Sequence, residues 1–271
     1  MTDGERGTVT VRGVMLHYAR TGSHNPPIVL AHGLTDNGAQ WEDLAEALSE
    51  TWDVVTYDAR GHGSSDKPAG DYGAADHAAD LLALIDALGL RQPVLLGHSM
   101  GGATVAHAAA AAPDIVRAVI LEDPAFTAPG RPVLALPGDT WAADWRARLD
   151  VYKSNTPADL RVAGRAEHPL WPEAQIEHWA TAKQQLDPVV LDWLYAQQTA
   201  WREVLARISC PTLLIIGESA LGSIVSLEVA TEMAQVLPHG QVTQVFGAGH
   251  SIRREQFERY RDAVTAFLRK L

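Results

Sequence analysis

The sequence holds a single cysteine, Cys210, among its 271 residues. One thiol cannot form an internal disulfide or a thiolate metal cluster, and this composition fits a reducing cytoplasm. Residues 1–5 also lack the basic stretch and the apolar block of a secretion signal. We therefore expect a cytoplasmic protein in which Cys210, just before a predicted buried strand, is a packed apolar side chain.

Basic residues and long apolar runs are also scarce. Lys and Arg number 22 against 33 Asp and Glu, which gives a formal net charge of −11. Nucleic acids and anionic membranes bind basic surfaces, so we expect neither as a partner. Gly, His, Ser and Pro interrupt every apolar stretch before it reaches the length of a membrane span. Hydrophobic residues still make up 46% of the chain, which is enough for a sizeable buried core.

Short apolar runs alternate with helical patterns along most of the chain. The predicted strands are 8–11, 15–20, 28–31, 53–57, 93–96, 116–121, 212–216 and 242–246. Apolar residues at helical spacing predict helices over 41–48, 81–88, 99–112, 227–237 and 257–268. This alternation predicts an α/β fold with an eight-stranded, mostly parallel sheet flanked by helices. The first two strands, on either side of a turn, are expected to be antiparallel.

Residues 125–205 break this alternation. Six of the eight tryptophans fall in this stretch: Trp141, Trp145, Trp171, Trp179, Trp193 and Trp201. No run there has the pattern of a buried strand, and polar helical segments such as 174–185 separate the aromatic residues. We expect a helical insertion between two strands of the main sheet, with residues 1–124 and 206–271 forming the core domain.

Residues 97–101, Gly-His-Ser-Met-Gly, fit the pattern Gly-x-Ser-x-Gly. The motif directly follows a predicted strand and opens a predicted helix, which is the position of a nucleophilic serine in a strand–turn–helix elbow. The glycines leave room for the bend, and the helix N-terminus favours developing negative charge. A tight turn with a helix-capping serine would need no such flanking elements. We therefore expect Ser99 to be a nucleophile, and the His98 side chain to point away along the elbow.

A serine hydroxyl is a weak nucleophile and needs a base within reach. His250 is the best candidate among the eleven histidines, because it lies in a glycine-rich loop between the last strand and the last helix. It also follows Ser99 in the chain, as the order serine, acid, histidine requires. His32 and His62 end other strands and are expected to line or brace the site. His107, in an alanine-rich helix, is expected to be packed.

An oxyanion that forms on the substrate must be held by N–H groups. Met100 follows the nucleophile, and its backbone N–H is the first candidate. The second comes from the loop that follows an earlier strand, where Leu34 is the expected donor. Neither role requires a particular side chain, so both assignments rest on position.

Four segments together resemble the α/β-hydrolase fold family. They are His-Gly at 32–33, Asp-Ala-Arg-Gly-His-Gly-Ser-Ser-Asp at 58–66, Gly-His-Ser-Met-Gly-Gly at 97–102 and Gly-Ala-Gly-His at 247–250. Their order resembles that family across nearly the whole chain. The resemblance implies a serine hydrolase without a metal or organic cofactor and a cap domain made by the tryptophan-rich insertion. It also implies a structural role for residues 58–66.

The acid that orients His250 has two candidates. Most of the family place it after the strand at 212–216, where this chain has Glu218 and no aspartate. Lactone-cleaving members that this chain resembles have it after the preceding strand, at the position that matches Asp123. We favour Asp123 and keep Glu218 as the alternative acid. Glu122 should point to the other side of its strand, because side chains alternate.

These residues together predict a carboxylic ester hydrolase. The tryptophans suggest an apolar pocket roof, which suits apolar esters or lactones such as acyl-homoserine or macrocyclic lactones. A serine at position 99 does not fit epoxide hydrolases or haloalkane dehalogenases, which need a carboxylate there. A carbon–carbon hydrolase acting on a vinylogous diketone and a low-turnover ligand sensor remain the alternatives.

Overall fold

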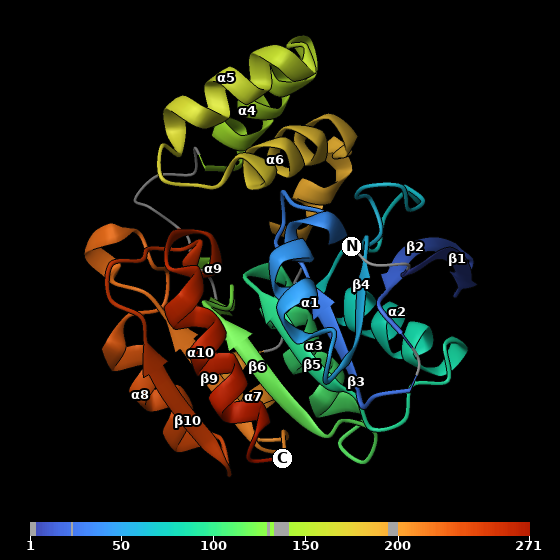
Figure 1. Ribbon diagram of the computed structural model, residues 1–271, viewed down its shortest axis with the longest axis vertical. Helices are drawn as coiled ribbons and strands as arrows, with labels where there is room; N and C mark the ends of the chain where they lie inside the picture. The colour runs from blue at the N-terminus through green and yellow to red at the C-terminus, as the bar shows by residue number, and fades with distance from the viewer. Residues whose placement is uncertain (1–3, 23, 129–130, 133–140, 195–199) are drawn as a thin grey trace.

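The computed structural model describes residues 4–22, 24–128, 131–132, 141–194 and 200–271. Its centre is an eight-stranded sheet of order β1-β2-β4-β3-β5-β6-β9-β10 (Figure 1). The strands are β1 (Glu5–Val11), β2 (Val14–Arg20), β3 (Pro27–Ala31), β4 (Asp53–Tyr57), β5 (Val94–His98), β6 (Ala118–Glu122), β9 (Thr212–Ile216) and β10 (Gly240–Gln244). β1 and β2 pair antiparallel, as do β2 and β4, and all other pairs are parallel. The predicted fold class is confirmed.

Helices cover both faces of the sheet because the buried strands are apolar on both sides. Along β3, Ile28 and Leu30 pack with α1 (Glu42–Leu48) and α10 (Phe257–Leu268). Val29 and Ala31 point to the other face, which the helices α2 (Ala74–Ala87), α3 (Met100–Ala111), α7 (Trp201–Leu205) and α8 (Leu227–Val236) cover. No helix in the described ranges has both the length and the apolar character needed to cross a bilayer.

The strand order reverses between β3 and β5, which lie side by side in the middle of the sheet. The chain leaves β3 toward β4 and leaves β5 toward β6, so the two following loops diverge from one point. In open α/β sheets, ligands bind outside the carboxyl ends of the strands at such a point. We therefore expect a ligand site at the residues that follow β3 and β5.

Two glycines let α3 approach the sheet closely at this point. A Cβ atom on Gly101 would lie 2.2 Å from the carbonyl oxygen of Ala31, at the end of β3. A Cβ atom on Gly97 would lie 2.2 Å from the carbonyl oxygen of Gly101. Both obstacles are backbone atoms, which cannot rotate aside. The glycines of the motif thus bring β3, β5 and the start of α3 together.

We expect Gly101→Ala to destabilise the protein by about 2–3 kcal/mol, because the added methyl group overpacks a rigid backbone contact. This corresponds to a drop in melting temperature of roughly 5–10 °C in a thermal unfolding experiment. Gly22→Ala is the matched control, since nothing lies within 4 Å of a Cβ atom at that position. Equal melting temperatures for the two variants would contradict the close approach of α3.

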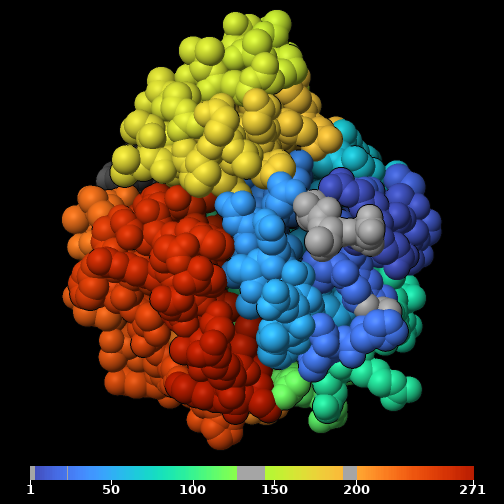
Figure 2. Space-filling view, in the orientation of Figure 1, coloured from blue at the N-terminus to red at the C-terminus, as the bar shows by residue number. Residues whose placement is uncertain are grey.

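A helical insertion lies between β6 and β9. It contains a hairpin of β7 (Thr127–Ala128) and β8 (Arg131–Pro132), then α4 (Trp141–Ser154), α5 (Pro157–Glu167), α6 (Glu173–Gln185) and η2 (Pro188–Leu194). Helices α4 to α6 form a lobe beyond one end of the sheet, drawn in yellow (Figure 2). Helix α7 packs against α3 and α8 instead, so it belongs with the core layer although the predicted insertion extends to residue 205.

Candidate active site

Ser99 lies between β5 and α3 in a strained backbone conformation. Its φ is 53° and its ψ is −116°, which non-glycine residues rarely adopt. Neighbouring loops hold it: its N–H donates to the Glu122 carbonyl oxygen at 3.0 Å, and its own carbonyl accepts from Ala125 N at 3.0 Å and Ala103 N at 3.1 Å. The chain bends sharply here, as the sequence pattern predicts.

Asp123 stands beside Ser99 because β5 and β6 are in register. His98 pairs with Glu122, so Ser99 and Asp123 are the residues that directly follow one matched pair. Both leave their strands with positive φ, 53° at Ser99 and 39° at Asp123. Two adjacent strand ends thus turn their next side chains out at the same edge of the sheet.

The Asp123 carboxylate is fully buried and contacts His250. His250 Nδ1 lies 2.7 Å from Asp123 Oδ2. Ser223 Oγ and the backbone N–H groups of Ile224 and Val225 also donate to this carboxylate, at 2.9, 2.9 and 3.0 Å. Since the carboxylate accepts, Nδ1 carries the proton, and Nε2 of a neutral imidazole is then left to accept one.

The other acids near the site have different partners. Glu218 Oε1 accepts from Gly247 N at 2.5 Å, so this carboxylate supports the loop that leads to His250 without contacting the imidazole. Glu122 lies on the opposite side of β6, where it accepts from the Arg253 backbone and side chain. Among the described residues, the structure therefore brings Asp123, and not Glu218, to the His250 imidazole.

The predicted oxyanion donors lie at the ends of the two central strands. Met100 is the first residue of α3, whose N–H has no partner within the helix. The Leu34 N–H, in the loop after β3, makes no hydrogen bond to any described residue. Ala31 pairs with Gly97, so the two loops start side by side.

Two buried histidines hold the loop that carries Leu34. His62 Nε2 lies 2.7 Å from the Leu34 carbonyl oxygen, and His32 Nδ1 lies 2.8 Å from that of Gly33. His32 Nε2 accepts from Ala59 N at 3.0 Å, which fixes its neutral tautomer. Burial lowers the pKa of both imidazoles, that of His62 to about 4. These side chains brace the loop, as expected from their positions.

The expectation for His98 is wrong. Its Nε2 lies 2.9 Å from the His250 carbonyl oxygen, and the two rings are 4.6 Å apart. Alternation along β5 places His98 on the same face as Val94 and Leu96, and the loop with His250 packs on that face. Burial holds the His98 pKa well below its usual value, so the neutral ring donates to the carbonyl. The missed residue thus fixes the backbone of His250.

A cavity of about 320 Å³ opens at this edge of the sheet, below the insertion. Ser99, His250 and Leu34 all line it. Its other walls combine aromatic and charged side chains, namely Trp145, Trp171, Trp179, Tyr152, His168, Asp36, Arg148, Glu167, Lys183 and Arg254. The predicted apolar roof therefore exists only in part, because three cations share it. Trp201 is buried elsewhere in the core, and the side chains of Trp141 and Trp193 lie outside the described residues.

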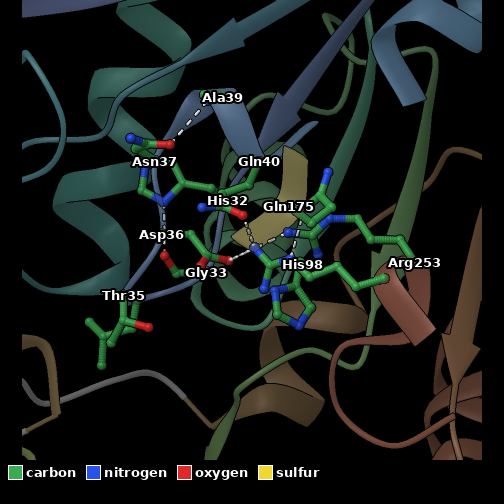
Figure 3. A network of polar contacts seen from close by, with 12 residues as sticks. His32, Gly33, Thr35, Asp36, Asn37, Ala39, Gln40, His98, Gln175 and Arg253 are labelled. Atoms are coloured by element: carbon green, nitrogen blue, oxygen red, sulfur yellow. Dashed lines mark hydrogen bonds and ion pairs between the residues drawn. The ribbon is translucent and has the colours of Figure 1, made fainter. Parts of the chain in front are cut away.

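A buried polar network joins the site to the insertion (Figure 3). Asp36 Oδ2 accepts from Arg254 Nη2 at 2.9 Å and lies 3.4 Å from Arg253 Nη2. Burial alone would raise the Asp36 pKa, but Arg254, Lys183 and Arg253 outweigh it and hold that pKa far below its usual range. Arg254 Nε also donates to Gln175 of α6 at 3.2 Å.

This network follows from no local pattern. The two adjacent arginines just after His250 are a visible signal, but Asp36, which both contact, lies more than two hundred residues away, and Gln175 and Glu122 are also distant in the sequence. In the described part of the chain, no group of three or more His, Cys, Asp or Glu side chains is arranged to hold a metal ion.

Comparison with known proteins gives a consistent result. A sequence model of the alpha/beta hydrolase fold matches residues 26–253. N-formylmaleamate deformylase of Pseudomonas putida is 30% identical over 97% of this chain and 96% of its own. 3-oxoadipate enol-lactonase 2 of Acinetobacter baylyi is 27% identical over 98% and 97%. The crystal structure of E-2-(acetamidomethylene)succinate hydrolase is similar with a TM-score of 0.83 and 25% identity, covering 98% of this chain and 99% of the other.

Proposed function

Since this chain belongs to the alpha/beta hydrolase fold family, we propose that it is a serine hydrolase that cleaves carboxylic esters and lactones through an acyl-enzyme. One observation carries the proposal: the 2.7 Å contact of His250 Nδ1 with Asp123 Oδ2, at a cavity that Ser99 also lines. A serine, a base and an orienting acid are the parts that acyl transfer requires.

The mechanism uses each group in turn. His250 Nε2 takes the Ser99 proton as Oγ attacks the substrate carbonyl, and Asp123 stabilises the imidazolium that forms. The N–H groups of Leu34 and Met100 hold the oxyanion. His250 then protonates the leaving group, and water repeats the sequence on the acyl-serine to release the acid.

Esters and lactones fit the cavity for two reasons. Three tryptophans line it, Trp145, Trp171 and Trp179, and flat apolar walls suit an acyl chain or a ring. The chain is also similar over its length to an enol-lactonase, which supports a lactone as substrate. We propose that the insertion acts as a cap, with α6 forming one wall.

Cleavage of an activated amide is the second candidate, because the chain is 30% identical to a deformylase over 97% of its length. The same acyl-serine would serve both reactions. A panel of a linear ester, a short-ring lactone, an N-formyl amide and a vinylogous diketone separates these classes by kcat/KM. The diketone also tests carbon–carbon cleavage, and turnover of any member excludes a pure sensor.

A fluorophosphonate probe tests the proposal directly. Such probes react with a serine that an imidazole activates, and we expect mass spectrometry of the digested protein to find one adduct, on Ser99. Ser99→Ala should not be labelled, whereas Ser49→Ala, which removes a hydroxyl outside the cavity, should be. An adduct on another residue, or none on the wild-type protein, would refute the proposed nucleophile.

We expect ethylenediaminetetraacetate to leave kcat and KM unchanged, since every group in the proposed mechanism is a side chain or a backbone N–H. Dialysis against the chelator followed by an ester assay measures this. Activity that falls and returns when zinc or magnesium is added would show that a metal takes part.

A further inference from the structure

A buried lysine lies in the wall of the cavity that Ser99 and His250 share. Lys183, on α6, is only 2% exposed. Its Nζ donates to the Thr35 carbonyl oxygen at 2.7 Å and to Thr35 Oγ1 at 2.6 Å. Among the described residues, its third N–H has no acceptor and no carboxylate forms an ion pair with it. An ammonium buried without a carboxylate is costly, which makes this position a candidate for binding an anion.

The two buried carboxylates nearby, Asp36 and Glu122, are already paired with other cations. Asp36 accepts from Arg254 at 2.9 Å, and Glu122 lies 3.3 Å from Arg253. Each of these two pairs has no net charge, so neither of them balances the positive charge of Lys183. Among the buried charges of this cluster, Asp36, Glu122, Lys183, Arg253 and Arg254, the cations therefore exceed the carboxylates by one.

The charged side chains that line the cavity also have a net positive charge. Its cations are Arg148, Lys183 and Arg254, and its carboxylates are Asp36 and Glu167. With the histidines neutral, the lining is positive, whereas the chain as a whole carries −11. A positive concavity on an acidic protein concentrates anions at that one place.

We propose that Lys183 and Arg254 form an anion subsite that binds a carboxylate of the substrate, away from the scissile carbonyl. The inference rests on the proposed hydrolase function and narrows its substrates to esters, lactones or amides that carry a free acid. Trp171 and Trp179 lie beside the two cations: Arg254 Cζ is 4.7 Å from the Trp171 ring centre, and Lys183 Nζ is 5.3 Å from that of Trp179. These rings flank the hydrocarbon between the acid and the reacting group.

Protonation of Lys183 makes the subsite depend on pH. Burial lowers the pKa of Lys183 to about 8. The negative charges of Asp36, in the loop after β3, and Glu167, at the end of α5, act to raise this pKa. The positive charge of Arg254 on α9 (Ile252–Glu255) acts to lower it further. The ammonium is therefore present below about pH 8 and is lost above it. We expect kcat/KM for an acid-bearing substrate to fall above that pH more steeply than for a neutral one.

A matched pair of esters tests the subsite. Mono-para-nitrophenyl adipate and para-nitrophenyl hexanoate have the same acyl chain length and differ by the terminal carboxylate. We expect the wild-type protein to have the lower KM for the adipate ester. Lys183→Met should raise that KM by about tenfold or more relative to the KM for the hexanoate ester, because a charge-assisted hydrogen bond to the carboxylate is lost.

Lys153→Met is the control. This exposed lysine on α4 also donates to a backbone carbonyl of α6, that of Gln184, but it does not line the cavity. Lys153→Met should leave kcat and KM for both esters close to the wild-type values. Lys183→Arg should retain most of the preference for the acid, since it retains the charge.

Other outcomes would overturn the inference. An equal loss of kcat for both esters in Lys183→Met would mean that the lysine only positions the loop through Thr35. Turnover of the hexanoate ester without a preference for the adipate ester would refute the subsite and leave the hydrolase function standing. If neither ester reacts, the hydrolase function fails instead, and calorimetric titration of adipate into the wild-type protein decides the subsite: binding that Lys183→Met abolishes supports it, and no binding refutes it.

Discussion

Ser99→Ala should lower kcat for a para-nitrophenyl ester by about a millionfold, the loss that follows when the nucleophile of such a triad is removed. Alanine adds no backbone strain to that of serine at the same φ of 53°, so the fold and the cavity should remain. A residual rate above that in water should persist, because the N–H groups of Leu34 and Met100 still polarise a bound carbonyl. Long spectrophotometric assays at high protein concentration, compared with the rate in buffer alone, measure both effects.

Pre-steady-state kinetics test directly whether Ser99 forms the acyl-enzyme. Wild-type protein should release a burst of para-nitrophenol equal to the concentration of active sites, as acyl-serine accumulates. The burst should vanish in Ser99→Ala and persist in Ser49→Ala. A variant that kept more than about a thousandth of the wild-type kcat would show that another group attacks the carbonyl, and the acyl-serine would have to be abandoned.

The core of the fold could be predicted because its signals are local. A strand buried on both faces needs a short apolar run with defined ends, and the strands at 53–57 and 212–216 appear with the predicted bounds. β10 (Gly240–Gln244) begins two residues earlier than predicted. Its residues at the edge of the sheet are mostly half-exposed, so their apolar character does not mark where pairing starts.

The insertion helices α4 and α5 could not be predicted in the same way. Val151 and Val162 on these helices and Leu170 after them are 55%, 73% and 84% exposed. An apolar residue therefore does not indicate the buried side of either helix. Thr156 and Asp159 do form a capping box at the start of α5, which is a local signal that apolar periodicity does not contain.

The site divides along the same line. Ser99 follows a strand and opens a helix, so five consecutive residues are enough to predict its elbow. The positions of His98 and Lys183 depend on which segments pack against them: a loop 152 residues away for the first and a loop 148 residues away for the second. No pattern within a segment carries that information, which is why the positive wall of the cavity emerges only from the fold.

Asp123→Asn should lower kcat by about ten-thousandfold, because it imposes the wrong tautomer on His250. Oδ1 can go on accepting from Ser223 Oγ and Val225 N, since both contact that oxygen. An amide NH₂ at the Oδ2 position would instead meet two donors, His250 Nδ1–H and Ile224 N–H. The imidazole relieves the conflict by moving its proton to Nε2, where it can no longer accept one from Ser99.

Glu218→Gln is the matched control, because the same change of carboxylate to amide falls on the alternative acid. Its Oε1 can still accept from Gly247 N, so kcat should remain close to the wild-type value. Steady-state assays on both variants, with circular dichroism to verify folding, decide between the two acids. A large loss in Glu218→Gln together with a small loss in Asp123→Asn would transfer the orienting role to Glu218. Asp123 would then be a buried carboxylate that stabilises the loop at Ser223 and nothing more.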